Sequence, residues 1–312
     1  MRRILLTGHD GQVGQELRKT LEPWGVVTGV GRSTLNLAQP DSIRHTLDRV
    51  KPDLIVNAAA YTAVDRAETD PAAAEAVNAI APAILAEYAH QLGADLIHIS
   101  TDYVFDGQKN TPYTEQDPPN PVSVYGHSKL AGEQAIQQAW LSSSVRQTNS
   151  TGSYMILRTA WVYGVYGKGN FVKTMLKLGS EREQVRVVAD QLGTPTWSSH
   201  LAQAIAQLIP KLNPETSGTY HFTNSGAASW YDFAIAIFEE AGQLGFPLKV
   251  RSVIPITTPE YPTPAQRPAY SILSCAKVST LLETHPPHWR KALRQMLIEL
   301  RATNATHLQT PQ

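Results

Sequence analysis

Short apolar runs alternate with longer stretches of mixed apolar and polar residues along the first half of the chain. The apolar runs cover residues 4–7, 26–30, 54–57 and 96–100, and another follows at 154–159. Runs of this length that are rich in β-branched residues are typical of strands buried on both faces of a parallel sheet. We therefore predict a parallel sheet that contains all of these runs.

Between the strands, apolar residues recur every three or four positions, which is the period of an amphipathic helix. Such patterns cover residues 13–21, 42–50, 72–92 and 124–140. Pro71 precedes the third pattern, and proline is favoured in the first turn of a helix. Alternating strands and helices predict an α/β fold of the Rossmann type, with a doubly wound parallel sheet and right-handed crossovers.

The alternation loosens after about residue 165, and prolines become frequent between residues 255 and 268. We predict a dinucleotide-binding domain over 1–164, whose sheet is completed by later segments. A smaller substrate-binding lobe is predicted over 165–300, interleaved with the first domain. The polar stretch SSSVRQTNSTGS at 142–153 predicts an exposed loop, and residues 301–312 predict a frayed polar tail.

Composition narrows the class of protein. Lys and Arg number 27 and balance 27 Asp and Glu in a chain of 312 residues, so charge gives no reason to expect a nucleic acid or a membrane surface as partner. The apolar runs are much shorter than the roughly 20 residues of a spanning helix. The single cysteine, Cys275, excludes an internal disulfide and fits a reducing compartment. We expect a soluble cytoplasmic protein.

Three glycines follow the first predicted strand in the sequence GHDGQVG, at positions 8, 11 and 14. Glycine permits a tight turn and lets main-chain N–H groups approach a pyrophosphate at the start of the next helix. A GxxGxxG pattern is weak evidence by itself, and it can also be a plain turn. Because a strand precedes it and a helix follows it, we predict a dinucleotide cofactor here.

The residue that distinguishes NAD from NADP is expected after the second strand, where an acidic side chain often binds the ribose 2′-hydroxyl. The chain has Gly31-Arg32-Ser33 there, with no acidic residue between Glu22 and Asp41. An arginine suits a 2′-phosphate, so Arg32 favours NADPH over NADH. The alternative is an ordinary solvated surface arginine.

The sequence YGHSK at 125–129 places Tyr125 and Lys129 one helical turn apart, and hence on one face. A free tyrosine titrates near pH 10, and a neighbouring ammonium lowers that pKa, which makes the phenol a usable acid or base. This pairing also occurs by chance on solvated helices. However, the fourth predicted strand ends in Ser100-Thr101-Asp102, and α/β sites lie at the carboxyl ends of strands. Thr101 would then help Tyr125 to polarise a substrate carbonyl.

Together with these residues, longer motifs carry a family resemblance. They are GHDGQVG (8–14), NAAAYTAVDRAE (57–68), STDYVFDG (100–107), YGHSK (125–129), RTAWVYG (158–164), DQLGTPT (190–196) and Arg267-Pro268. On these motifs the chain resembles the extended short-chain dehydrogenase/reductase superfamily. Within it, the chain is similar to the dTDP-4-dehydrorhamnose reductase family over roughly residues 1–300.

The resemblance implies an oxidoreductase that uses NADPH, or NADH, to reduce the C4 ketone of dTDP-4-dehydro-6-deoxy-L-mannose (dTDP-4-dehydrorhamnose) to dTDP-L-rhamnose. Thr101, Tyr125 and Lys129 match the family's catalytic positions. Tyr125 would protonate the nascent alkoxide and Thr101 would hydrogen-bond the substrate oxygen. Lys129 would tune Tyr125 and bind the cofactor's ribose.

Further positions are carried over from the family. Besides Tyr125 and Lys129, the expected cofactor contacts are Gly8, Gly11, Gln12, Val13, Arg32, Asn36, Leu37, Ala58, Ala59 and Ala60. The expected substrate contacts are Val64, Asp102, Tyr103, Trp161 and Arg267. Structural alternatives remain for three of them: Trp161 as a core aromatic, Asp102 as a turn cap, and Arg267 as the partner of a structural carboxylate.

The chain also departs from the family pattern. Asn36-Leu37 stands where many members of the superfamily have an acidic residue before an aliphatic one, which makes the cofactor preference less certain although an amide still suits the adenine. Residues 142–153 resemble an insertion. Some family members hold Mg²⁺ with glutamates at a dimer contact, but no metal cluster is identifiable in the sequence. A requirement for Mg²⁺ and a homodimer both stay open.

Two other functions compete with the reductase. A nucleotide-sugar 4,6-dehydratase usually has an acid pair after the threonine, but here Asp102 is followed by Tyr103, and NAAAYTAVDRAE disfavours a 4-epimerase. The other competitor is a non-catalytic NADP-binding regulatory subunit, similar to that of methionine adenosyltransferase. The intact set of Thr101, Tyr125 and Lys129 favours a working reductase over that subunit.

Overall fold

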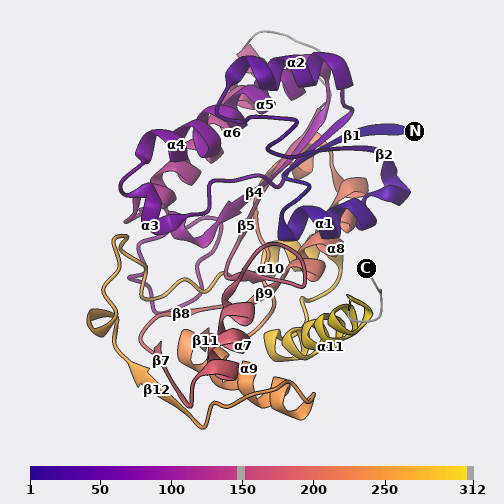
Figure 1. The fold of residues 1–312 in the computed structure, drawn as a ribbon. Helices are drawn as coiled ribbons and strands as arrows, with labels where there is room; N and C mark the ends of the chain where they lie inside the picture. Colours follow the sequence, from indigo (N-terminus) through magenta and orange to yellow (C-terminus); the bar gives the residue numbers. More distant parts are fainter. Residues whose placement is uncertain (146–151, 308–312) are drawn as a thin grey trace.

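A six-stranded parallel sheet forms the centre of the molecule (Figure 1). The structure is a computed structural model that describes residues 1–145 and 152–307. The sheet has the order β10-β5-β4-β3-β1-β2. Its strands are β1 Arg2–Thr7, β2 Gly25–Val30, β3 Leu54–Asn57, β4 Asp95–Thr101, β5 Tyr154–Thr159 and β10 Gly218–His221. The five predicted strands are confirmed, and β10 from the second half of the chain extends the sheet beside β5.

The strand sequences explain why both faces of the sheet are buried. Side chains alternate between the two faces, so Ile4 and Leu6 pack into one apolar cluster and Leu5 packs into the other. All four residues of β3 are buried. A strand that is apolar at every position needs a covering layer on each side.

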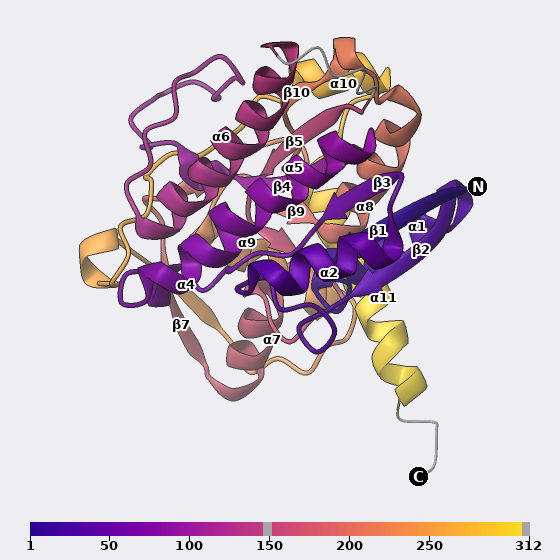
Figure 2. The same cartoon turned by 90° about the horizontal axis from the view of Figure 1, so that it is seen from above.

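Helices supply both covering layers, as the view from above shows (Figure 2). One face is covered by α1 Gln12–Thr20, α8 Ser198–Leu208 and α10 Ala276–Leu282. The other is covered by α2 Pro40–Val50, α5 Ala81–Leu92 and α6 Val124–Val145. The predicted α/β fold with a doubly wound sheet is therefore confirmed. Two helices of the first layer come from the second half of the chain.

The helix predicted over 72–92 is interrupted once. It consists of α4 Pro71–Glu75, a π-helical turn at Ala76–Ile80, and α5. The Asp70 side chain accepts a hydrogen bond from the Ala73 N–H, which caps the helix start. Pro82 has no N–H to donate within the helix, so the regular hydrogen-bond pattern is weakened beside the π-turn.

A smaller group of elements packs beside the sheet, at the lower side of Figure 1. Its longer members are α7 Phe171–Glu181, β7 Gln184–Val188, α9 Trp230–Gln243, β12 Ser252–Ile256 and α11 Trp289–His307. They enclose a separate apolar cluster around Phe233, Trp289 and Met296. The division into a domain at 1–164 and a lobe at 165–300 stays a prediction.

Short elements complete the chain. The strands β6 Val162–Tyr163 and β9 Thr196–Trp197 pair with each other, as do β8 Leu192–Gly193 and β11 Ala228–Ser229. The short helices are η1 Glu22–Trp24, α3 Val64–Ala67, η3 Asp102–Val104, η4 Ile209–Lys211, η5 Pro214–Thr216 and η6 Thr258–Glu260. No helix in the described part of the chain is long and apolar enough to cross a membrane.

Two local predictions are wrong. Helix α6 runs to Val145 and residues 152 and 153 are buried, so 142–153 is not one exposed loop; residues 146–151 lie outside the described part. The burial has a cause, because the Ser153 N–H donates to Asp95 Oδ1 at 2.9 Å as the chain re-enters the sheet. The predicted tail is helical to His307, since Leu300, directly before it, packs in the core; residues 308–312 are not described.

Candidate active site

The glycine turn after β1 lies directly against the turn after β3. Gly8 has a φ of +69°, and the Gly11 N–H donates to the Gly8 carbonyl at 2.9 Å. A Cβ at Gly8 would lie 2.8 Å from the Ala59 Cα, and a Cβ at Gly14 would overlap the Gly8 carbonyl oxygen. Only glycine permits this approach. Because the strand order reverses between β1 and β3, the two turns border the crevice in which doubly wound sheets bind ligands.

The other predicted cofactor residues of this region differ in exposure. Ala58, Ala59 and Ala60 are half-buried beside the glycine turn. Gln12 donates from Nε2 to the Val162 carbonyl at 3.0 Å, so its side chain is held by the chain itself. Val13 packs against the apolar cluster under the sheet. The backbone of this turn is thus better placed than its side chains to receive a pyrophosphate.

The residues predicted near the adenosine lie after β2. Arg32 and Asn36 are exposed, whereas Leu37 is buried in the core. The Asn36 Oδ1 accepts from the Ala38 N–H at 3.0 Å, which closes a local turn. Arg32 is therefore free to reach outward, while Leu37 offers little surface to a ligand.

One acidic residue beside this region could not be recognised from sequence spacing. Asp10 comes from the glycine turn, and its carboxylate lies so close to Gly31 that a Cβ there would overlap it. Its Oδ1 lies 3.0 Å from His9 Nε2. The dinucleotide fingerprint predicts an acidic residue only after the second strand. The parallel pairing of Thr7 with Val30 is what brings Asp10 next to Gly31.

Thr101, Asp102 and Tyr125 meet where β4 and α6 approach each other. Thr101 ends β4, and Tyr125 lies in the first turn of α6. The Thr101 hydroxyl adjoins the Tyr125 phenol, and Thr101 Oγ1 donates to Asp102 Oδ1 at 3.0 Å. All three side chains are buried. The structure therefore brings these three predicted residues into contact.

Aromatic and aliphatic side chains surround Tyr125. Tyr103 meets it edge to face, with 5.5 Å between the ring centroids. Val64, at the start of α3, packs in the same small cluster. This apolar surrounding has an electrostatic effect: burial raises the pKa of Tyr125 to about 12, although the adjoining Thr101 hydroxyl opposes the rise.

The predicted effect of Lys129 on the Tyr125 pKa is wrong for this structure. Lys129 shares a helix face with Tyr125, but its Nζ donates to the Ile99 carbonyl at 2.7 Å and lies 3.1 Å from His98 Nε2. The ammonium is thus turned toward β4. Burial lowers the pKa of Lys129 to about 8, while the charge of Glu133 opposes that decrease. Desolvation is the largest cause of the pKa shift at both residues.

Asp102 presents a free acceptor in this pocket. Its side chain is 2% exposed, and its Oδ2 has no hydrogen-bond partner among the described residues. Burial raises its pKa to about 6, and the neighbouring Ser271 and Thr101 hydroxyls limit the rise. A buried carboxylate oxygen without a partner is costly, so this atom is suited to accept from a ligand hydroxyl.

Trp161, two residues beyond the end of β5, has a strained conformation. Its φ is +47°, in a region that costs a non-glycine residue about 1–3 kcal/mol. The indole stacks on Trp230 with centroids 3.5 Å apart and the rings 6° from parallel. Its other neighbour is Gly193, where a Cβ would lie 2.5 Å from the indole. Trp230 and Gly193 were missed from sequence, because only the fold brings them to Trp161.

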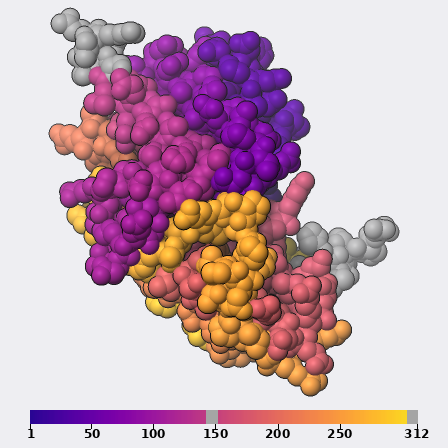
Figure 3. All heavy atoms as spheres, turned by 90° about the vertical axis from the view of Figure 1, so that its left-hand side faces the viewer, coloured from indigo at the N-terminus to yellow at the C-terminus, as the bar shows by residue number. Residues whose placement is uncertain are grey.

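Arg267 links the two halves of the chain beside Tyr103. Its Nη2 lies 2.8 Å from Asp65 Oδ2 in an ion pair, and it also hydrogen-bonds the Tyr103 hydroxyl. Figure 3 shows the orange segment that contains Arg267 lying against the purple and magenta first half. The structure thus has the carboxylate partner that the sequence left as the alternative to a phosphate contact.

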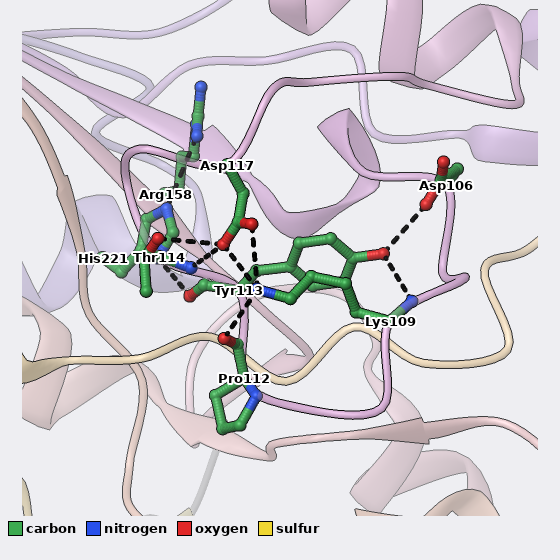
Figure 4. Close-up of polar contacts among 8 residues, drawn as sticks. All are labelled: Asp106, Lys109, Pro112, Tyr113, Thr114, Asp117, Arg158 and His221. Carbon is green, nitrogen blue, oxygen red and sulfur yellow. Dashed lines mark hydrogen bonds and ion pairs between the residues drawn. The ribbon is translucent and has the colours of Figure 1, made fainter.

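The loop between η3 and α6 connects Asp102 to Tyr125, and internal polar contacts hold it (Figure 4). Lys109 pairs with Asp117 at 2.8 Å, and the Tyr113 hydroxyl donates to Asp106 at 2.9 Å. His221 of β10 contacts the Tyr113 carbonyl through Nδ1 at 3.1 Å. These contacts hold the loop together and, through His221, attach it to β10. The described residues contain no cluster of three or more His, Cys, Asp or Glu side chains able to hold a metal ion.

Comparison with known proteins gives consistent similarities. The family model described as the RmlD substrate binding domain matches residues 1–302. The chain is 42% identical to a dTDP-4-dehydrorhamnose reductase of Burkholderia thailandensis over 299 residues, which cover 93% of this chain and 96% of that protein. It is 41% identical to the one of Escherichia coli K12 over 309 residues, which cover 97% and 99%.

Solved structures agree with these sequence matches. A dTDP-4-dehydrorhamnose reductase from Bacillus anthracis, in complex with NADP, superposes with a TM-score of 0.84 at 37% identity, covering 96% of this chain and 99% of that one. A UDP-glucose 4-epimerase from Thermus thermophilus, in complex with NAD, reaches a TM-score of 0.78 at 20% identity, with 96% and 99% coverage. The second similarity shows the shared fold alone.

Proposed function

The chain belongs to the dTDP-4-dehydrorhamnose reductase family, and from that membership we propose that it reduces the C4 ketone of dTDP-4-dehydrorhamnose to dTDP-L-rhamnose with a nicotinamide cofactor. The contact between Thr101, Asp102 and Tyr125 carries the proposal. It supplies a proton donor, a hydrogen-bonding hydroxyl and a free acceptor in one buried place. Reduction of a ketone to an alcohol needs the proton donor and the hydrogen-bonding hydroxyl.

The state of Tyr125 suits an acid. A phenol with a pKa of about 12 holds its proton at neutral pH, as a group must before it protonates an alkoxide. The Thr101 hydroxyl adjoins the phenol and would hydrogen-bond the same substrate oxygen. Asp102 Oδ2 would accept from a sugar hydroxyl, and the Trp161 indole would border the sugar. When bound, the reduced cofactor supplies the hydride.

The cofactor is proposed to be NADPH. The residues that would hold it are the backbone of Gly8, Gly11 and Gln12, the turn at Ala58–Ala60, and Lys129, with Arg32, Asn36 and Leu37 toward the adenosine. The NADP complex of the Bacillus anthracis protein supports this choice, and so does the exposed Arg32. Asp10 beside Gly31 opposes a 2′-phosphate, so we expect measurable use of NADH.

Other parts of the proposal rest on single features. Arg267 is proposed to exchange Asp65 for the diphosphate of the substrate, since a guanidinium binds both kinds of oxygen anion. Val64 and Tyr103 are proposed to line the sugar side of the pocket. The single cysteine supports a reducing compartment, which we take to be the cytoplasm.

The matched relatives are reductases over nearly their whole length, which disfavours the regulatory-subunit function. The epimerase function is disfavoured because the epimerase similarity is confined to the fold, at 20% identity. A reductase for a related dTDP-4-keto sugar would share the same chemistry, and the choice of sugar is the part that an assay must decide.

The test mixes the purified protein with NADPH and enzymatically generated dTDP-4-dehydrorhamnose, and follows the loss of nicotinamide absorbance. We expect Tyr125→Phe to lower kcat at least about 100-fold while NADPH affinity, measured by fluorescence titration, changes little. Tyr163→Phe is the matched control, because this tyrosine is buried in the other core cluster and its hydroxyl has no partner among the described residues. NADPH that binds but is never oxidised by the wild type would favour the regulatory-subunit function.

A further inference from the structure

Lys129 is the last member of a buried hydrogen-bond chain that begins at the glycine turn. Thr7 Oγ1 donates to Asn57 Oδ1 at 2.6 Å, and Asn57 Nδ2 lies 2.9 Å from His98 Nδ1. His98 Nε2 then lies 3.1 Å from Lys129 Nζ. The four residues come from β1, β3, β4 and α6, and each is buried. The proposed mechanism uses only Lys129, so the other three have no part in it yet.

The direction of each hydrogen bond in the chain follows from Asn57. The Ala59 main-chain N–H, which can only donate, points at Asn57 Oδ1 at 3.3 Å. The amide oxygen of Asn57 is therefore on the side of Ala59 and Thr7, and its NH₂ group faces His98. His98 Nδ1 must accept, which leaves the proton of the neutral imidazole on Nε2. Burial keeps His98 neutral by lowering its pKa well below the ordinary value, and the charge of Lys129 acts in the same direction.

The imidazole thus presents an N–H to the lysine. A protonated Lys129 has three donors and no acceptor, so its ammonium and the His98 N–H would meet as two donors. A neutral amine instead accepts from His98 and still donates to the Ile99 carbonyl at 2.7 Å. We propose that His98 is a positioning residue that holds the Lys129 amine at the site and disfavours its protonation, because Asn57 directs the imidazole proton toward the lysine.

The other charged groups around Lys129 act against His98 or are more distant from it. Glu133, one turn further along α6, favours the charged lysine, but its carboxylate is held by Arg158 of β5 at 2.7 Å and by the Ser100 hydroxyl. Tyr125 on α6 and Asp102 on η3 lie on the other side, in contact with Thr101. The pKa of Lys129, about 8, indicates that burial outweighs Glu133, and the donor from His98 acts in the same direction as burial.

The inference also predicts how catalysis depends on pH, and this part rests on the proposed function. Lys129 changes its charge near pH 8 rather than near pH 10.4, roughly the value of a free lysine. We expect the rate of ketone reduction to fall on the alkaline side as Lys129 loses its proton. Burial places that fall near pH 8, and on the proposal the His98 N–H lowers its pH further.

The experiment measures the titration of Lys129 itself. The protein is labelled with [ε-¹³C]lysine, and Lys129 is assigned as the resonance missing in Lys129→Met. In the wild type we expect this resonance to titrate near pH 8. His98→Gln offers an amide oxygen to the ammonium, so its Lys129 pKa should rise by at least about one pH unit.

A second variant keeps His98, reverses the direction of its hydrogen bond and adds a negative charge, and both changes favour the protonated lysine. The carboxylate introduced by Asn57→Asp still accepts from Thr7 and Ala59 but cannot donate, so the imidazole proton moves to Nδ1 and Nε2 accepts from Lys129. The Lys129 pKa should again rise. His221→Gln is the matched control, because His221 is equally buried on β10 and contacts Tyr113 and Arg158. It should leave the Lys129 titration unchanged.

An unchanged Lys129 pKa in both His98→Gln and Asn57→Asp overturns the inference, and so does a wild-type Lys129 that titrates above about pH 10. Neither result depends on turnover. A shifted lysine in a protein that never oxidises NADPH would instead leave the His98 inference standing and remove the proposed function. In an active protein, the alkaline decrease in kcat should move to higher pH in His98→Gln. The titration midpoint of the Lys129 resonance should move to higher pH with it.

Discussion

Asp102 is the residue whose ionisation most directly bears on substrate binding in the proposed site. Its carboxyl group is buried, bonded through one oxygen to Thr101 and open at the other. An acceptor of this kind is strongest while it is ionised, because protonation turns one of its two oxygens into a donor. The raised pKa, about 6, places that change just below neutral pH.

This gives a prediction for the pH profile. We expect kcat/KM of the wild type to fall about tenfold per pH unit below pH 6, because the free protein's Asp102 then becomes protonated. Asp102→Asn should have a lower kcat/KM and no inflection near pH 6. Steady-state kinetics from about pH 5 to about pH 9 at saturating NADPH would measure both. An inflection at the same pH that survives in Asp102→Asn would assign it to another group.

At the scale of elements, the first strand, the glycine turn and the first helix form a unit. Its geometry depends on glycine, because no side chain fits at certain positions. Gly14 lies inside α1, yet a Cβ there would overlap the Gly8 carbonyl oxygen and approach His9 Cα at 2.7 Å. Both neighbours are backbone, so neither can rotate away. The helix can begin where it does, and expose its first N–H groups to a phosphate, only if this position carries no side chain.

We therefore predict that Gly14→Ala lowers the free energy of unfolding by at least about 2 kcal/mol and weakens NADPH binding about tenfold or more. Gly242→Ala is the matched control, since Gly242 also lies in a helix and a Cβ there meets no atom within 4 Å. That substitution should stabilise the protein by up to about 1 kcal/mol. Urea unfolding and NADPH titration of both variants test the pair, and equal effects would contradict the steric argument.

At the scale of the whole molecule, three segments far apart in sequence meet around one buried acid. Glu16 of α1 is 5% exposed. Its neighbours are Ser198 at the start of α8 and Glu299 on α11. Burial, followed by repulsion from Glu299, raises the pKa of Glu16 to about 7, although Lys19 and Ser198 oppose the rise.

The sign of the stability effect follows from proton binding. Between the ordinary pKa, 4.5, and about 7, the folded protein binds more protons at Glu16 than the unfolded chain does, so the free energy of unfolding decreases as pH rises through this window. Above about pH 7 the folded protein bears the full free-energy cost of a buried, ionised Glu16. We predict that Glu16→Gln, which cannot ionise, is more stable than the wild type at about pH 8 by roughly 1–3 kcal/mol.

The advantage should disappear near pH 4.5, where Glu16 is protonated in the folded protein. Urea unfolding at the two pH values measures it. Glu22→Gln serves as the control, because Glu22 is exposed in η1 just beyond the same helix, and its effect should stay within about 0.5 kcal/mol. A Glu16→Gln variant that is no more stable on the alkaline side would show that the carboxylate is satisfied in the folded protein.

Local pattern was sufficient for much of the fold and for part of the candidate site. The five strands of the first half lie where the apolar runs are, because a strand buried on both faces must be apolar at nearly every position. The glycine turn and the shared helix face of Tyr125 and Lys129 could also be predicted, since sterics and helical period act over a few residues.

The tertiary structure decided what depends on partners distant in sequence. Chain topology decides which segment extends the sheet beside β5. It also pairs Asp65 with Arg267 and places Asp10 beside Gly31. The ionisation of Tyr125 and Lys129 was misjudged from spacing alone, because one turn of helix specifies proximity but not desolvation. Sequence by itself determined which groups this protein carries at the ends of its strands; burial and the neighbours supplied by the fold determined their charge and hydrogen bonding.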